Sequence, residues 1–147
     1  MELKHIGLEE RKDLLPTLLA VWDSSVRATH DFLREGDVEF LSPYVEQGLG
    51  EIPLLFYALE DGRPIAFLGM AGDSIEMLFV HGDCRQRGIG SVLMREALAR
   101  GARRVDVNEQ NAQALAFYRR FGFEVASRDG TDSLGLPYPI LHCELKK

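Results

Sequence analysis

The sequence predicts a mixed α+β fold of the α/β type, in which a central sheet of about seven strands is flanked by about four helices. Seven short segments carry alternating or β-branched apolar residues, and four longer ones repeat apolar residues at helical spacing. These segments follow the order β-α-α-β-β-β-α-β-α-β-β. Because 147 residues contain no linker and no internal repeat, we expect residues 1–147 to form a single domain.

The first half of the chain predicts an N-terminal strand, two helices and a three-stranded meander. The predicted elements are a strand at 2–6, helices at 14–26 and 38–47, and strands at 54–59, 65–71 and 75–80. Pro16 should begin or kink the first helix, and Pro43 should interrupt the second, because proline lacks an N–H and clashes with the preceding turn. Turn signals at Asp61-Gly62 and Gly72-Asp73 predict antiparallel hairpins between the three strands.

The second half predicts a strand that returns beside the last strand of the meander. Its predicted elements are a helix after residue 88, a strand at 103–108, a helix at 111–121 and a final hairpin of 123–127 with 140–145. A helical crossover makes the strands at 75–80 and 103–108 parallel neighbours. In α/β sheets, ligands bind at the carboxyl ends of such strands, where they part.

A basic glycine loop joins the strand at 75–80 to the next helix. It contains Arg85, Arg87, Gly88 and Gly90 at a place where the first backbone N–H groups of a helix have no intrahelical partner. Those groups and the helix dipole favour an anion, and glycine lets a phosphate approach the main chain. The string is neither a Walker loop nor a dinucleotide-binding G-x-G-x-x-G, so these two nucleotide sites are disfavoured.

A second motif follows one helix and one strand later, in residues 111–123, where the sequence reads NAQALAFYRRFGF. Together with the R-x-x-G-x-G loop, it resembles the GNAT superfamily of acetyl-CoA-dependent N-acetyltransferases. That superfamily pairs a glycine loop after its fourth strand with N-x-x-A-x-x-[F/Y]-Y-x-x-x-G-F on a later helix. The segments at 22–33, 107–111 and 135–139 are most similar to its small bacterial YjaB-type branch.

The resemblance implies that acetyl-CoA is the co-substrate and assigns residues to it. The pantetheine arm should lie along the fourth strand, the pyrophosphate on the loop, and further contacts should come from the later helix. The expected cofactor-binding residues are Leu78, Phe79, Val80, Arg85, Gln86, Arg87, Gly88, Ile89, Gly90, Ser91, Asn111, Ala114, Phe117 and Tyr118. No metal is expected, since the two cysteines, Cys84 and Cys143, have no metal-ligand spacing.

Acetyl transfer to an amine needs a proton donor for the leaving thiolate and a base for the ammonium. Tyr118 matches the family tyrosine that faces the sulfur and is expected to act as the general acid. Glu76, on the fourth strand, is the first candidate for the base; His30, His81 and a chain of water molecules are the alternatives. Trp22 and His30 lie where the family caps the acceptor side and are expected to contact the substrate.

Charge and composition narrow the partners. The net charge is −6, but residues 85–120 carry a net +5 and the remainder therefore −11. This division suits a polyanionic cofactor at one place and a cationic small-molecule or peptide amine at another, and it argues against nucleic acid. The sequence shows no bilayer-spanning apolar run and no signal segment, so we expect no membrane association and a cytoplasmic protein.

The main hypothesis is therefore an acetyl-CoA-dependent N-acetyltransferase that acts on a primary amine. The alternative is a catalytically weak acyl-CoA-binding or sensor module, which the same motifs would also produce. A homodimer that pairs through the sheet edges of the final hairpin is compatible with the sequence.

Overall fold

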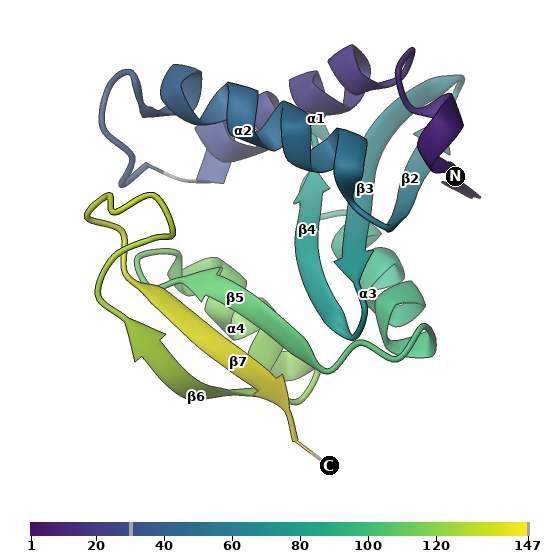
Figure 1. The fold of residues 1–147 in the computed structure, drawn as a ribbon. Helices are drawn as coiled ribbons and strands as arrows, with labels where there is room; N and C mark the ends of the chain where they lie inside the picture. Colours follow the sequence, from purple (N-terminus) through teal and green to yellow (C-terminus); the bar gives the residue numbers. More distant parts are fainter. Residues whose placement is uncertain (30, 147) are drawn as a thin grey trace.

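The structure, a computed structural model, describes residues 1–29 and 31–146. Its centre is a seven-stranded sheet in the order β1-β2-β3-β4-β5-β7-β6 (Figure 1). The strands are β1 (Glu2–His5), β2 (Leu54–Glu60), β3 (Arg63–Ala71), β4 (Ser74–Val80), β5 (Arg104–Asn108), β6 (Phe123–Asp129) and β7 (Ile140–Leu145). Neighbouring strands are antiparallel except for β4 and β5, which are parallel as predicted.

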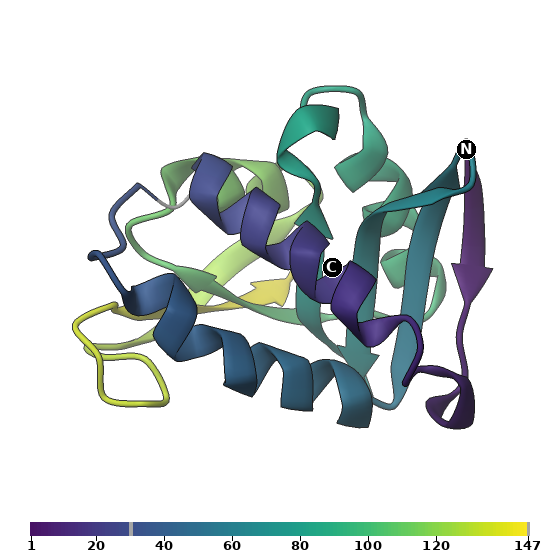
Figure 2. The same ribbon diagram turned by 90° about the horizontal axis from the view of Figure 1, so that it is seen from above.

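In the described part of the chain, four α-helices cover the two faces of this sheet. They are α1 (Leu15–Thr29), α2 (Asp37–Glu51), α3 (Ile89–Ala99) and α4 (Ala112–Arg120). Figures 1 and 2 show α1 and α2 side by side on one face, with α3 and α4 on the other. Among residues 1–29 and 31–146, no helix combines the length and hydropathy that crossing a bilayer requires.

The sheet separates two apolar cores. The core under α1 and α2 contains Trp22, Leu49 and Phe67, and the core under α3 and α4 contains Leu93 and Phe123. Residues 65–70 of β3 are buried throughout, since both faces of this central strand are covered. Burial of these apolar side chains is the main favourable contribution to folding and places β3 at the centre of the packed sheet.

The sheet divides between β4 and β5. These strands pair only at their beginnings, where Ser74 faces Arg104 and Ile75 faces Val105, and they diverge beyond that point (Figure 1). On its other side, β5 pairs with β7 along all five of its residues. The second half of the sheet therefore swings away from the first as a unit, which confirms the predicted parting of the parallel strands.

Proline has different effects at the two positions that the sequence singles out. Pro16 is the second residue of α1, where a missing N–H costs nothing, as predicted. The expectation that Pro43 interrupts the second helix is wrong, because α2 continues from Asp37 through to Glu51. The apolar face of α2 packs on α1 and the sheet, with Val38 and Leu49 buried, and this packing offsets the lost hydrogen bond.

Candidate active site

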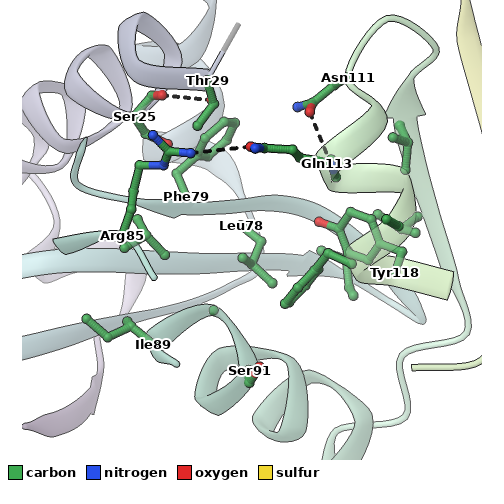
Figure 3. Close-up of a pocket in the computed structure, with 18 of the residues that line it drawn as sticks. Ser25, Thr29, Leu78, Phe79, Arg85, Ile89, Ser91, Asn111, Gln113 and Tyr118 are labelled. Atoms are coloured by element: carbon green, nitrogen blue, oxygen red, sulfur yellow. Dashed lines mark hydrogen bonds between the residues drawn. The ribbon is translucent and has the colours of Figure 1, made fainter. Parts of the chain in front are cut away.

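A cavity of about 570 Å³ opens where β4 and β5 separate, and we call it the cofactor cavity after the role that the sequence predicts for this place. It is walled by β4, the glycine loop, the start of α3, the end of β5 and α4, with α1 at one side (Figure 3). Of the residues expected to form the site, those that line it are Glu76, Leu78, Phe79, Val80, Arg85, Gln86, Gly88, Ile89, Gly90, Ser91, Asn111, Ala114, Phe117 and Tyr118. The two sequence motifs therefore meet across one cavity.

The glycine loop delivers the N-terminus of α3 to this cavity. Gly88 is the N-cap residue, and its positive φ of 79° is a conformation that glycine adopts without strain. The first intrahelical hydrogen bond runs from Val92 N to Gly88 O at 3.2 Å, so the N–H groups of Ile89, Gly90 and Ser91 precede the helical ladder. All three residues line the cavity, which gives it the local chemistry of an anion site.

The two loop arginines are placed differently. Arg85 lines the cavity, and its Nη2 donates to Gln113 Oε1 of α4 at 3.3 Å, a bond that Figure 3 shows spanning from the loop to α4. The side chain of Arg87 does not line the cavity and instead forms an ion pair with Glu60 at the end of β2, with 2.6 Å between Nη2 and Oε2. The structure thus brings the Arg85 side chain into the site and leaves that of Arg87 outside it.

Asn111 caps helix α4 at the edge of the cavity. The sequence places it in the helix, but in the structure it is the buried N-cap residue, and its Oδ1 accepts a hydrogen bond from Ala114 N at 3.1 Å. This contact satisfies one of the unpaired N–H groups of the first turn. Asn111 therefore fixes the point at which α4 begins and, with it, the position of Tyr118 two turns later.

Tyr118 lines the cofactor cavity from α4. It is only 8% exposed, and its ring packs edge-on against Phe117 and Phe123, with centroid distances of 5.2 and 6.0 Å. Figure 3 shows its hydroxyl directed away from α4 toward the side of Leu78. Burial, and to a lesser extent the nearby Cys143 thiol, raises the pKa of Tyr118 well above that of an exposed phenol. The hydroxyl is therefore a proton-bearing group at all physiological pH values.

Glu76 is placed by a β-bulge in β4. Met77 pairs with Gly69 and Ile75 pairs with Met70, so that Glu76 is the extra residue between them. A bulge reverses the alternation of side chains, and in keeping with this Ile75 packs in the core under α3 while Met77 packs under α1 and α2. Glu76 itself is exposed and lines the cofactor cavity as well as a second cavity beside it.

The second cavity, of about 390 Å³, is called the acceptor cavity below. It lies between α1, α2 and the loop that joins β6 to β7 and shares Glu76, Met77, Phe79 and Asn108 with the cofactor cavity. Trp22, expected at the substrate site, lines this second cavity. His30, the other residue expected there, falls outside the described residues.

A buried carboxylate holds the two walls of the acceptor cavity together. Asp37, at the start of α2, accepts hydrogen bonds from the hydroxyl of Tyr138 and from Arg34 N, the latter at 3.0 Å. Tyr138 lines the acceptor cavity and lies 101 residues further along the chain. These bonds hold the pKa of Asp37 below its usual value, and the bond from the Tyr138 hydroxyl has the largest effect. The β6–β7 loop is thereby tied to the helix pair.

His81, an alternative base in the sequence, lines neither of the two cavities. Its Nδ1 accepts a hydrogen bond from Asp83 N at 3.1 Å and lies 3.3 Å from Ser24 Oγ, and the Ser24 hydroxyl accepts from Gly82 N at 3.0 Å. His81 therefore anchors the loop that follows β4 to α1.

Sequence reasoning missed several residues of the cofactor cavity. Gln113 and Arg120 stand seven residues apart on α4, on the stripe that also contains Ala116 and Phe117, so helical spacing could have found them. Ser25 and Thr29 reach the cavity from α1, and only the packing of α1 across the sheet reveals that.

Comparisons with known proteins agree with this geometry. A family profile described as "Acetyltransferase (GNAT) domain" matches residues 53–125. The chain is 40% identical over 126 residues to the peptidyl-lysine N-acetyltransferase YjaB of Salmonella typhimurium, covering 85% of this chain and 87% of that protein. The solution structure of apo-form YjaB from Escherichia coli matches with a TM-score of 0.82 and 36% identity, over 97% of this chain and 95% of that one.

A more distant match shares the fold. The crystal structure of the PaiA N-acetyltransferase from Thermoplasma acidophilum in complex with coenzyme A is 19% identical, with a TM-score of 0.65, over 98% of this chain and 99% of that one. The chain is 40% identical to a YjaB sequence along most of its length. Its splayed strands, glycine loop and buried tyrosine agree with that similarity. This chain therefore belongs to the GNAT family of acetyltransferases.

Proposed function

We propose that this protein transfers an acetyl group from acetyl-CoA to the side-chain amine of a lysine in a protein or peptide. The observation that carries the proposal is the meeting of the cofactor and acceptor cavities at Glu76. A thioester held in the first cavity and an amine entering through the second would come together at that residue. The relatives named peptidyl-lysine N-acetyltransferases support lysine as the amine.

The cofactor cavity has the features that coenzyme A requires. The N–H groups of Ile89, Gly90 and Ser91, with the Arg85 guanidinium nearby, would hold the pyrophosphate. Beyond Ile75, β4 has no pairing with β5 in the described register, so its backbone can accept an extended arm as an added strand. Acetyl-CoA, when bound, supplies the activated acetyl group.

Tyr118 and Glu76 would act on the leaving sulfur and on the incoming amine. The Tyr118 hydroxyl, the expected general acid, would donate a hydrogen bond to the departing sulfur, because burial keeps the phenol protonated. Glu76 would accept a proton from the incoming ammonium, directly or through water, because its carboxylate stands where the two cavities meet. The walls of both cavities would hold the reacting groups in contact.

Binding and transfer can be tested separately. Acetyl-CoA and coenzyme A at 100 times their dissociation constants should each add about 2.7 kcal/mol and raise the melting midpoint by several degrees, whereas ATP should not. Mass spectrometry of a lysine-containing peptide incubated with acetyl-CoA should place the acetyl group on lysine Nζ. Stabilisation without transfer would favour the acyl-CoA-binding module, and no stabilisation would refute the cofactor site.

A matched pair of arginine variants tests the loop. Arg85→Ala should weaken acetyl-CoA binding about tenfold, since a charge-assisted contact to phosphate is lost. Arg87→Ala removes the same charge from the same loop but breaks the ion pair with Glu60 and no side-chain contact in the cavity, so its effect on affinity should be smaller. Equal losses in the two variants would show that the loop attracts the cofactor by net charge alone.

A further inference from the structure

Exposed large apolar side chains gather at the mouth of the acceptor cavity. In the described part of the chain, six large apolar side chains stand exposed, and three of them, Phe40, Tyr44 and Leu134, belong to this mouth. Tyr44 and Leu134 line the cavity, and the ring of Phe40 lies 5.7 Å from that of Tyr44. We call these three side chains the apolar rim. Exposed apolar groups gathered in this way mark a contact surface.

The rim is built by two elements that the fold holds in place. Phe40 and Tyr44 occupy neighbouring turns of α2, and Leu134 projects from the β6–β7 loop. Asp132 shapes that loop, since its Oδ1 accepts hydrogen bonds from Leu134 N at 3.0 Å and Leu136 N at 2.8 Å. The rim is therefore a prearranged surface, which lowers the entropic cost of binding a partner.

Charge distinguishes the inside of the cavity from the rim. The described lining of the acceptor cavity contains two carboxylates, Glu76 and Asp132, and no lysine, arginine or histidine. Trp22, Met77 and Phe79 also line this cavity, and their apolar side chains suit a run of methylene groups. A lysine side chain complements this lining, because it has an apolar stem and a cationic head.

We infer that the acceptor is a lysine flanked in its peptide by a large apolar residue, which packs on the apolar rim while the lysine amine reaches Glu76. This inference rests on the proposed function and adds a substrate class to it. A polyamine or an aminoglycoside, cationic or hydroxylated along its whole length, would leave Phe40, Tyr44 and Leu134 exposed to water. A peptide buries the rim and satisfies the carboxylates at the same time.

The test compares two peptides of equal charge, each with one lysine, flanked on both sides by phenylalanine in one and by serine in the other. The wild type should acetylate the first with a kcat/KM about tenfold higher, because one well-buried apolar side chain contributes that much. The double variant Phe40→Ala/Leu134→Ala should reduce the ratio to less than about threefold. Leu8→Ala/Val125→Ala, which also removes two exposed apolar side chains but away from both cavities, should keep the wild-type ratio.

Binding gives a readout that does not depend on transfer. Trp22 is the single tryptophan of the chain, is 4% exposed and lines the acceptor cavity, so its fluorescence reports occupancy. In the presence of coenzyme A, titration with the two peptides should show the same preference for phenylalanine, and the rim variant should lose it. Size-exclusion chromatography of the wild type and the rim variant checks whether a second copy of the chain covers the rim.

The outcomes separate the two proposals. Acetyl transfer with equal kcat/KM for the two peptides would overturn the rim inference and leave the transferase intact. A fluorescence preference without transfer would support the rim and refute the proposed reaction. A dimer in the wild type that dissociates in the rim variant would overturn the inference, because the rim would then be a subunit contact.

Discussion

Replacement of Tyr118 by phenylalanine isolates the contribution of one hydroxyl to the proposed reaction. The ring and its contacts with Phe117 and Phe123 are retained, so the fold and the cofactor cavity should be preserved. A thiol has a reference pKa of about 8.5 and a phenol one of about 10, and burial raises the pKa of Tyr118 further. Complete proton transfer to the thiolate would therefore cost more than about 2 kcal/mol, and the hydroxyl should act chiefly as a hydrogen-bond donor.

The expected magnitude follows from that role. A hydrogen bond to a charged group contributes about 1.5–3 kcal/mol, which corresponds to a fall in kcat of roughly 10- to 100-fold. The dissociation constant of acetyl-CoA should change by less than about threefold, since the bond forms mainly as charge develops on sulfur. The ratio of wild-type to variant kcat should stay constant from pH 7 to about pH 9, because the raised pKa keeps the phenol protonated over this range.

The assay follows release of the coenzyme A thiol with a thiol-reactive dye. Both cysteines of the chain, Cys84 and Cys143, are buried, so the protein itself should react slowly with the dye. Tyr57→Phe is the control, because it removes the same hydroxyl from β2, outside both cavities. An unchanged kcat for Tyr118→Phe would remove the residue from the mechanism, and an equal fall for Tyr57→Phe would point to a general effect on the fold.

Three further predictions follow from other contacts. Gly90→Ala should stabilise the free protein by about 0.5–1 kcal/mol, because alanine favours a helix and its Cβ would meet the ring of Phe117 at an ordinary 3.5 Å. The same variant should weaken acetyl-CoA binding, as calorimetry would show; unchanged affinity would contradict the proposed pyrophosphate site at the N-terminus of α3. Tyr138→Phe should lower the melting midpoint by about 5 °C and raise KM for the peptide more than KM for acetyl-CoA; equal changes would deny it a role in the acceptor wall. The pKa of His142 is raised by its hydrogen bonds to Asp129 and Asp106, so its stabilising effect is complete below about pH 6.5 and lost as the pH rises through the raised value. The free energy of unfolding in urea should fall over this pH range in the wild type but not in His142→Gln. Identical pH profiles for the wild type and the variant would refute this role of His142.

Local patterns in the sequence determine the elements and the cofactor motifs. The periods of apolar residues predict the seven strands and four helices in their order, because each depends on residues a few positions apart. The glycine loop and the motif at 111–123 are also local, and the crossover rule brings them together, so most of the cofactor-cavity lining was predictable. The number and order of elements and the family follow from this information.

Contacts between segments that are distant in the sequence decided the features that local patterns do not predict. The bulge that places Glu76 between the two cavities depends on pairing with Gly69, and Arg87 leaves the site because the end of β2 offers Glu60. The helix through Pro43 persists because its apolar face is packed. The β6–β7 loop is tied to α2 beside the acceptor cavity because Asp37 binds Tyr138 across 101 residues of chain. No periodicity in a sequence encodes such a pairing, since its free energy arises only when the folded chain brings the partners together and removes them from water.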